Sequence, residues 1–330
     1  KQKLDYARAV RDGKIHDPGF LPVIFEHPDD MVADGSALKL ENMWMTNPNM
    51  GFSVDQDFLE REYRKAEMAG GESFRGFMAK HANVEIGMNL RSDRWAGSEF
   101  WEAQAKAPGL TLQELLERSE VVDVGIDGGG LDDLLGLAVI GRERETRKWL
   151  LWTHAWAHPS VFERRKEIAP RLHDFARDGD LTLSGRMGDD VAEVAEICEL
   201  IESRGLLDKI GCDPAGLGGI TDALHEAGIP PEKMIGISQG WKLHGAILTA
   251  ERKLAEGVLV HSGQPLMAWC VGNAKVEPRG NAVMITKQAA GTGKIDPLMA
   301  TFDAATLMAL NPEGSGDLQG FFDNPIMVGI

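Results

Sequence analysis

Three apolar runs with only short polar connections between them constrain the fold of this chain more than any other feature. They are VVDVGI at residues 121–126, LLGLAVI at 134–140 and KWLLWTHA at 148–155. Runs of this length, rich in β-branched and aromatic residues and bounded by glycine or charged loops, are typical of strands. Consecutive strands joined by short loops pair in the antiparallel sense. The sequence therefore predicts a three-stranded meander over residues 121–155.

Helical and strand-like segments alternate after the meander. We expect helices at 160–177, 189–203, 217–227, 243–257 and 297–310, strands at 181–183, 209–213 and 234–237, and a hairpin at 273–287. A meander followed by alternating helices and strands builds a mixed sheet that is covered by helices on both faces. This order is ribonuclease H-like. We therefore predict an α/β protein with a ribonuclease H-like mixed β-sheet flanked by helices.

The chain changes character near residues 110–119, from polar and helical to strand-rich. We expect a small, mostly helical linker segment at 1–118, the ribonuclease H-like domain at 119–312 and a flexible tail at 313–330. Within the linker segment, the pattern predicts a short strand at 19–26 and a capped helix from about Ser53 to Ala69. Because the chain opens with a lysine inside a helical pattern, we expect a piece of a longer polypeptide.

Composition excludes several classes of protein. A formal net charge of -16 argues against a protein that coats nucleic acid through a global positive field, although it leaves room for a local basic track. The three cysteines are widely separated and form no CxxC pair, so we predict neither a disulfide framework nor a zinc site. No run approaches the roughly 18 apolar residues of a membrane helix. We expect a soluble, intracellular protein.

Three aspartates occupy positions that favour a shared metal centre. Asp127 and Asp213 each end a predicted strand, and Asp296 directly precedes a predicted helix. Two Mg²⁺ or Mn²⁺ ions roughly 3.5–4 Å apart, bridged by carboxylates, activate water and stabilise the leaving oxyanion in phosphodiester cleavage. Such hard cations prefer oxygen ligands. The pattern predicts a two-metal hydrolase, while each aspartate taken singly is as typical of a strand end or a helix cap. Either Asp132 or Asp133, on the turn after Asp127, would add a further ligand or support one.

Basic residues gather on the predicted hairpin and on its approach to Asp296. They are Lys275, Arg279, Lys287 and Lys294. Lysine and arginine at such positions can hold backbone phosphates without reading sequence. We therefore predict that these four residues bind DNA and that Lys287 or Lys294 steadies the scissile phosphate. A solvated, charged hairpin would show the same spacing.

Four motifs occur in a fixed order between residues 21 and 310. They are WMTNPNMG at 44–51, VGID at 124–127 with its following Asp132-Asp133, GCD at 211–213 and KIDPLMA at 294–300. Together they resemble the large terminase subunit of tailed bacteriophages. The first is similar to a segment near the end of that family's motor domain, and the others are similar to the three motifs of its C-terminal nuclease domain.

This resemblance implies an activity and a set of partners. Asp127, Asp213 and Asp296 would be the metal ligands, with Asp133 as an accessory acid, in an endonuclease that cuts concatemeric double-stranded viral DNA during genome packaging. The small terminase subunit and the portal are implied as partners, and the bacterial host cytoplasm as the location. The chain has no GxxxxGK[ST] loop, so we expect no ATPase activity from it alone. Residues 1–118 would be the end of the motor domain and the linker.

Two other interpretations remain open. The glycines that follow Asp127, through Gly130, also resemble the first phosphate loop of sugar kinases and actin-like ATPases. A non-catalytic module that docks onto packaging proteins is the second, although three acids at one edge would repel one another without a metal. A zinc pair at His154 and His158 is a weaker candidate because the two residues end a strand.

Overall fold

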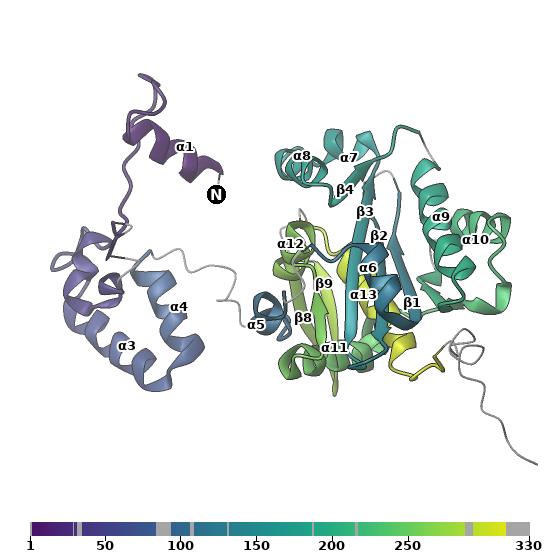
Figure 1. Cartoon of the computed structure of the whole chain (residues 1–330). Helices are drawn as coiled ribbons and strands as arrows, with labels where there is room; N and C mark the ends of the chain where they lie inside the picture. The colour runs from purple at the N-terminus through teal and green to yellow at the C-terminus, as the bar shows by residue number, and fades with distance from the viewer. Residues whose placement is uncertain are drawn as a thin grey trace, which may run out of the picture. The chain divides into compact units, whose positions relative to one another are not determined.

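The predicted meander forms the centre of a mixed sheet (Figure 1). In the computed structural model, β1 pairs antiparallel with β2, and β2 pairs antiparallel with β3. Parallel neighbours extend the sheet on both sides, and in the described part of the chain it has seven strands in the order β4-β3-β2-β1-β5-β6, with β7 also paired to β3. The prediction of a ribonuclease H-like mixed sheet flanked by helices is confirmed. The strands are β1 (Ser119–Gly128), β2 (Leu135–Glu143), β3 (Trp149–Ala157), β4 (Leu181–Leu183), β5 (Leu207–Cys212), β6 (Met234–Gly236) and β7 (Leu259–His261).

The structure describes residues 2–28, 30–31, 35–83, 94–105, 109–130, 132–186, 188–214, 217–287 and 293–314. These fall into two compact units, Lys1–Ser92 and Asp93–Ile330. The helices of the second unit are α5 (Ser98–Trp101), α6 (Leu112–Arg118), α7 (Pro159–Arg164), α8 (Ala169–Arg177), α9 (Asp189–Ser203), α10 (Leu217–Glu226), α11 (His244–Glu256), α12 (Pro265–Asn273) and α13 (Asp296–Met308). Its short 3-10 helices are η4 (Glu102–Gln104), η6 (Pro231–Lys233) and η7 (Gly240–Leu243).

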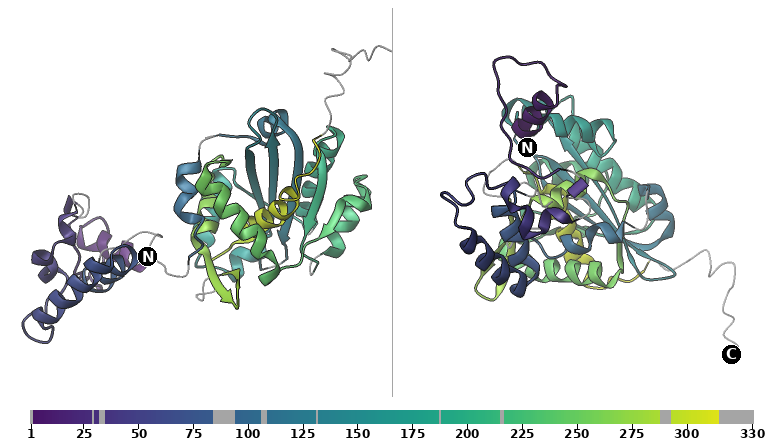
Figure 2. Two further views of the ribbon diagram at one scale, coloured as in Figure 1. Left: turned by 90° about the horizontal axis from the view of Figure 1, so that it is seen from below. Right: turned by 90° about the vertical axis from the view of Figure 1, so that its left-hand side faces the viewer.

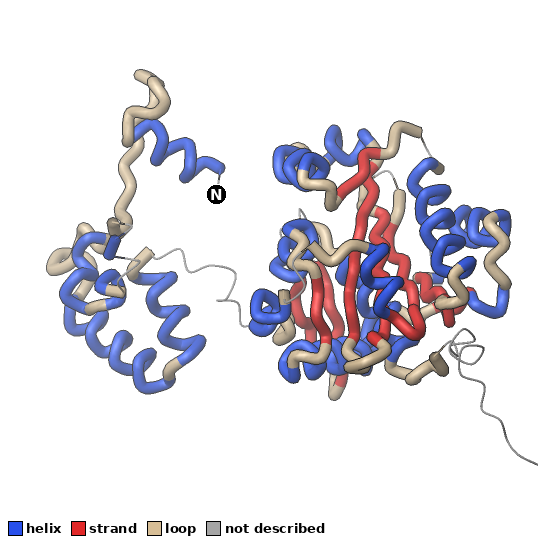
Figure 3. The backbone as a smooth tube through the Cα atoms, in the orientation of Figure 1, coloured by secondary structure: helices blue, strands red, loops and turns tan. Residues whose placement is uncertain are grey.

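Helices cover both faces of the sheet, as the blue and red tubes in Figure 3 show. One face packs on α11, α12 and α13, and the other packs on α6, α9 and α10. Side chains along β1 alternate between the two faces of the sheet. Val122, Val124 and Ile126 point into the core that contains α9 and α10. The odd-numbered residues 125 and 127 therefore face α13.

Glycines in the central strands let α13 approach the sheet closely (Figure 2). A Cβ atom at Gly125 would lie 1.9 Å from the carbonyl oxygen of Ala300 and 2.6 Å from the amide nitrogen of Ala304. A Cβ atom at Gly136 would lie 2.6 Å from the carbonyl carbon of Asp296. These neighbours are backbone atoms of α13, so they cannot rotate away as a side chain could. The two glycines set the distance between the helix and the strands.

The sheet unit begins earlier than the expected domain boundary at residue 119. Trp95 packs edge-on against Phe302 of α13 with ring centroids 5.2 Å apart, and Trp101 stacks on His261 of β7 at 3.8 Å. α6 begins with a capping box between Thr111 and Glu114. The aromatic contacts tie residues 94–105 to the sheet, and Leu115 and Leu116 pack α6 into one of its cores. The Lys1–Ser92 unit is helical, as expected for most of the predicted linker.

The first unit has its own small core, and one expected element is absent from it. Its elements are α1 (Gln2–Arg11), η1 (Ser36–Leu38), η2 (Leu40–Met45), α3 (Gln56–Ala69) and α4 (Gly71–His81). The prediction of a strand at 19–26 is wrong: those residues have no strand partner in the described unit, and Leu21 and Val23 are exposed. In the motif at 44–51, the Asn47 side chain donates to the carbonyl oxygen of His81 at 2.6 Å, which ties the motif to the end of α4.

Two further expectations need adjustment. The helix expected over 160–177 is broken into α7 and α8, because Pro170 in the first turn of α8 has no amide to bond the preceding turn and its ring would clash with the carbonyl group four residues earlier. The expected tail at 313–330 lies outside the described residues from 315 onward. The residues just before it are held, since Arg142 donates to the Asn311 side chain and to the carbonyl oxygen of Pro312. No helix in the described part of the chain is long and apolar enough to cross a membrane.

The close approach of α13 predicts the effect of one added methyl group. Gly125→Ala should destabilise the protein by more than about 3 kcal/mol, because the new Cβ would overlap backbone atoms of α13. Gly245→Ala, in α11 and with no atom within 4 Å of the new Cβ, should instead gain roughly 0.5–1 kcal/mol. Urea denaturation followed by circular dichroism measures both. Equal urea midpoints for the parent and Gly125→Ala would contradict the close packing of α13 on β1.

A buried acid in the middle of β1 predicts a pH dependence of stability. Burial, together with repulsion by Asp208 and against a hydrogen bond from the Lys209 amide, raises the pKa of Asp123 to about 8. The folded protein therefore keeps a proton that the unfolded chain releases above pH ~4, so this group costs stability as the pH rises from about 4 to about 8. Asp123→Asn should melt about 5 °C above the parent at pH 8 and much closer to it at pH 4.5. An equal shift at both pH values would contradict this assignment.

Candidate active site

The carboxyl ends of β1 and β5 meet the start of α13 at a cavity of about 510 Å³. Asp127, Asp133, Asp213 and Asp296 all line it. β1 and β5 are parallel neighbours, with Ile126 opposite Cys212, so Asp127 near the end of β1 and Asp213 directly after β5 lie at the same edge of the sheet. The structure thus brings together all four residues that the sequence predicted as metal ligands.

Asp296 reaches this edge because α13 lies directly against the strands. Its side chain is 2 % exposed, and a Cβ atom on Gly128 would lie 3.2 Å from its Oδ1. The carboxylate is therefore packed beside the residue that follows Asp127. It also belongs to the first turn of α13, where the unpaired amides and the helix dipole favour negative charge.

The donors at the cavity match hard divalent cations in kind. Four carboxylates offer the oxygen ligands that Mg²⁺ and Mn²⁺ prefer. Cys212 also lines the cavity, but burial raises the pKa of its thiol to about 12, which leaves it protonated and a poor ligand at neutral pH. In the arrangement present, no three His, Cys, Asp or Glu side chains among the described residues lie close enough together to hold an ion.

A fifth acid, Asp303, lies behind the predicted ligands. It is fully buried on α13 and accepts a hydrogen bond of 2.9 Å from the Gln239 amide. The pKa of Asp303 is raised to about 9. Burial is the largest cause, and the charges of Asp127 and Asp213 act in the same direction, while the hydrogen bond from Gln239 opposes them. Asp303 is therefore a neutral acid at pH 7. The sequence analysis missed it, although it lies seven residues after Asp296, two turns along the same face of the helix.

The predicted hairpin forms one wall of the cavity. It consists of β8 (Ala274–Arg279) and β9 (Ala282–Lys287), and Ile285 and Thr286 of β9 line the cavity. The Thr286 hydroxyl donates to Glu277 across the hairpin at 3.1 Å. On its other edge, the Val283 amide donates to Nδ1 of His244 at the start of α11. The hairpin is thus attached to the helical layer rather than standing free.

The four residues predicted to bind DNA lie in different environments. Arg279 is exposed near the hairpin turn, and Lys275 is partly buried with its Nζ 3.6 Å from Glu277. Lys287 ends β9, and its side chain lies outside the described residues. Lys294 differs from the expectation: it is 2 % exposed, and its Nζ donates to the Asp133 carboxylate at 2.7 Å. An ammonium group held in this way is not on the surface where DNA would lie.

The two histidines of the weaker zinc interpretation bind hydroxyl groups instead. Nε2 of His154 lies 2.8 Å from the hydroxyl of Thr182, and Nδ1 of His158 lies 2.9 Å from that of Ser160. Burial lowers the pKa of His154 to about 4. Both histidines are explained by these structural contacts at the end of β3.

Comparison with known proteins places this chain in a family. A family model described as "Terminase large subunit, endonuclease domain" matches residues 24–311. The large terminase subunit of Enterobacteria phage HK97 is 26% identical over 334 residues, covering 95% of this chain and 59% of that protein. Protein YmfN of Escherichia coli (strain K12) is 22% identical over 264 residues, covering 77% of this chain and 56% of that protein. The chain therefore spans less than two thirds of the length of these relatives.

The same relationship appears in three dimensions. The crystal structure of the HK97 bacteriophage large terminase matches with a TM-score of 0.54 at 20% identity, covering 92% of this chain and 60% of that chain. This match extends across the mixed sheet, and the described residues contain one such sheet rather than the two lobes of a sugar kinase. Since the family model covers most of the sequence, the chain belongs to the terminase large subunit family and carries its endonuclease domain.

Proposed function

We propose that this protein is a metal-dependent endonuclease that cleaves double-stranded, concatemeric viral DNA during genome packaging. One observation carries the proposal: four carboxylates from three separate segments line a single cavity at the carboxyl edge of the sheet. Grouping like charges in this way is unfavourable without a cation. A fold gains nothing from such an arrangement unless a cation is bound there.

Two Mg²⁺ or Mn²⁺ ions are the cofactors that this donor set favours. Asp127 would contact both ions because it lies on the central strand, with Asp213 and Asp296 on either side and Asp133 as the accessory ligand. When bound, such ions supply an activated water and neutralise charge on the phosphate in the transition state. The chain itself contributes rigid carboxylates and an apolar lining of Ile126, Ile220, Ile285, Ile295 and Met299, which strengthens electrostatic interactions within the cavity.

The size of the cavity favours cleavage of one strand at a time. About 510 Å³ is within the roughly 300–1,000 Å³ of small-ligand sites, so a backbone phosphate can enter while the duplex remains outside. Lys275, Arg279 and Lys287 of the hairpin are the residues that would contact that duplex through its phosphates. The net charge of -16 requires such binding to be local.

The wider context of the activity is also a proposal. We place the Lys1–Ser92 unit and the following linker at the end of an ATPase domain, as the motif at 44–51 suggests. The HK97 relative is named a terminase large subunit, and by analogy the small subunit and the portal are the expected partners in the bacterial host cytoplasm.

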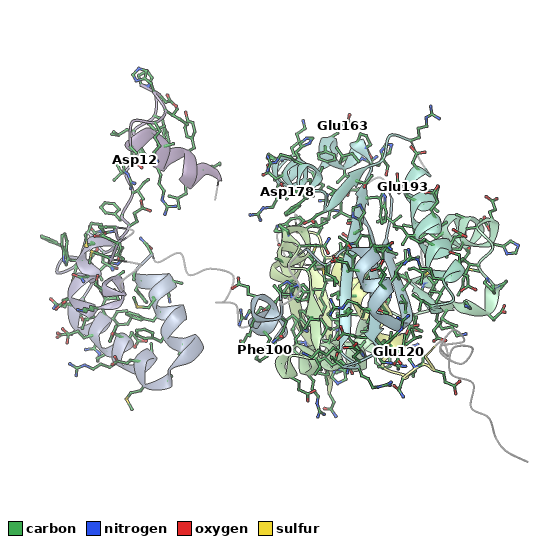
Figure 4. All side chains as sticks on the ribbon, viewed as in Figure 1. Asp12, Phe100, Glu120, Glu163, Asp178 and Glu193 are labelled. Carbon is green, nitrogen blue, oxygen red and sulfur yellow. The ribbon has the colours of Figure 1, made fainter. Side chains whose placement is uncertain are left out.

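A plasmid assay tests the activity. With Mg²⁺ or Mn²⁺ the parent should convert supercoiled plasmid to nicked and linear forms, and chelator should stop this. Asp127→Asn should reduce cutting to background because it removes the ligand shared by both ions. Asp178→Asn is a matched control: this exposed acid follows α8 (labelled in Figure 4) and does not line the cavity, so it should cut like the parent.

The outcomes separate the candidate functions. Metal-dependent cutting that survives in Asp127→Asn would exclude the proposed centre. If neither metal supports cutting but the protein binds ATP, the phosphate-loop interpretation of residues 127–130 gains support. If it neither cuts nor binds nucleotide or metal, the docking module is the remaining interpretation.

Metal binding should be visible without any DNA. Mn²⁺ at about 100 times its Kd should stabilise the parent by about 2.7 kcal/mol, which corresponds to a rise in Tm of roughly 5–10 °C. In chelator, Asp127→Asn should melt at or above the parent temperature, because the mutation removes one charge from the group of carboxylates. Differential scanning calorimetry measures both effects. A parent Tm that does not respond to Mn²⁺ would count against a metal centre.

A further inference from the structure

Lys294 is a buried lysine two residues before the first residue of α13. Its side chain is 2 % exposed, and its Nζ donates to Oδ1 of Asp133 at 2.7 Å and to the backbone carbonyl oxygen of Asp132. Both acceptors belong to the turn between β1 and β2. Lys294 therefore links two segments that are 161 residues apart in sequence, and each of those segments carries a predicted metal ligand.

The burial of Lys294 is costly unless the ammonium has fixed partners. Removing such a charge from water costs several kcal/mol before its partners compensate for the loss. A lysine that served to contact a phosphate would extend its charged end into solvent while its methylene groups pack below. Lys294 does the opposite, since its charged end is enclosed and bonded to the protein.

The turn that Lys294 holds has little stiffness of its own. Gly128, Gly129 and Gly130 have φ angles of 87°, 96° and 131°, a conformation that glycine adopts freely but that no side chain reinforces. The Gly129 amide donates to the carbonyl oxygen of Leu134 at 2.8 Å. The Leu134 amide also donates to Oδ1 of Asp133 at 3.2 Å, and the two aspartates of the turn make further contacts with basic side chains.

Two basic side chains contact those aspartates, Arg165 at Asp132 and Lys294 at Asp133. Arg165, directly after α7, donates to both carboxylate oxygens of Asp132 at 3.0 and 2.6 Å. This pair is partly exposed, with side-chain exposures of 32% and 42%, so screening by water weakens it. In the contact between Lys294 and Asp133, the lysine is buried and the aspartate lines the cavity. This contact is the stronger restraint on the turn.

We propose that Lys294 is a positioning residue that holds Asp133 at the cavity, so that this carboxylate is already in place when the cation arrives. This inference rests on the proposed function, because only that function makes Asp133 a metal ligand. The segment 294–296 then does two things at once: it supplies Asp296 and it fixes the turn that supplies Asp133. The ammonium also offsets part of the negative charge that the four carboxylates bring together.

Metal titration of matched variants tests this role. The apparent Mn²⁺ affinity, read from the rise in Tm with metal concentration, should fall about 10–100-fold in Lys294→Met. Lys80→Met, at an exposed lysine of the helical unit, should keep the parent affinity. The effect of Lys294→Met should largely disappear in an Asp133→Asn background, because the residue that Lys294 positions is no longer a charged ligand. Additive losses in the double variant would overturn the proposal.

A second measurement separates positioning from DNA contact. In chelator, log K for a DNA duplex is measured against log salt concentration. Loss of a phosphate contact would reduce the slope by about 0.9, whereas a positioning role leaves the slope of Lys294→Met equal to that of the parent. A reduced slope with unchanged Mn²⁺ affinity would return Lys294 to DNA binding and overturn the proposal.

Loss of folding and failure of the proposed function give results that differ from loss of positioning. If Lys294→Met melts early because Asp133 is left without its partner, Lys294→Met/Asp133→Asn should recover most of the lost Tm. If it does not, the lysine supports the core and not Asp133. A parent that shows no Mn²⁺ response overturns the proposed function together with this inference. A parent that responds while Lys294→Met responds identically overturns the inference alone.

Discussion

The contact between α13 and the two central strands is the constraint on which the rest of the site depends. Gly125 and Gly136 remove the side chains that would keep the helix away, and backbone packs against backbone. The start of α13 is thereby held at the end of β1, with Asp296 beside the residue that follows Asp127. Parallel pairing of β1 and β5 adds Asp213 at the same edge. A metal centre of this type requires fixed carboxylates, and this packing is what fixes them.

Such an arrangement concentrates negative charge, and the structure shows how that charge is limited. Asp303 lies closest to the core, and its raised pKa keeps it neutral while Gln239 holds it in place. Lys294 brings a buried positive charge to Asp133, which lines the cavity. With one acid neutral and another paired, fewer charges remain to be balanced by a bound cation. The same features explain why the site can exist in the folded protein before metal binds.

Much of the fold could be predicted because its signals are local. The three apolar runs became β1, β2 and β3, and the hairpin formed at the expected residues. The strand expected at 19–26 failed because an apolar run becomes a strand only when a partner is available, and the described unit provides none. The helix over 160–177 was expected to be continuous, yet Pro170 breaks it. Aromatic contacts of Trp95 with Phe302 and of Trp101 with His261 join residues 94–105 to the sheet unit, and no local pattern reveals such contacts.

The sequence by itself determined the residue types at the site and the order in which strands and helices present them. Periodicity and strand-ending aspartates are properties of short segments, so they are visible without a structure. Only the tertiary structure decided which charges are exposed and which are paired. Lys294 was predicted to face DNA, but long-range packing buries it against Asp133. Burial and pairing depend on segments far apart in the chain, and no spacing within one segment contains that information.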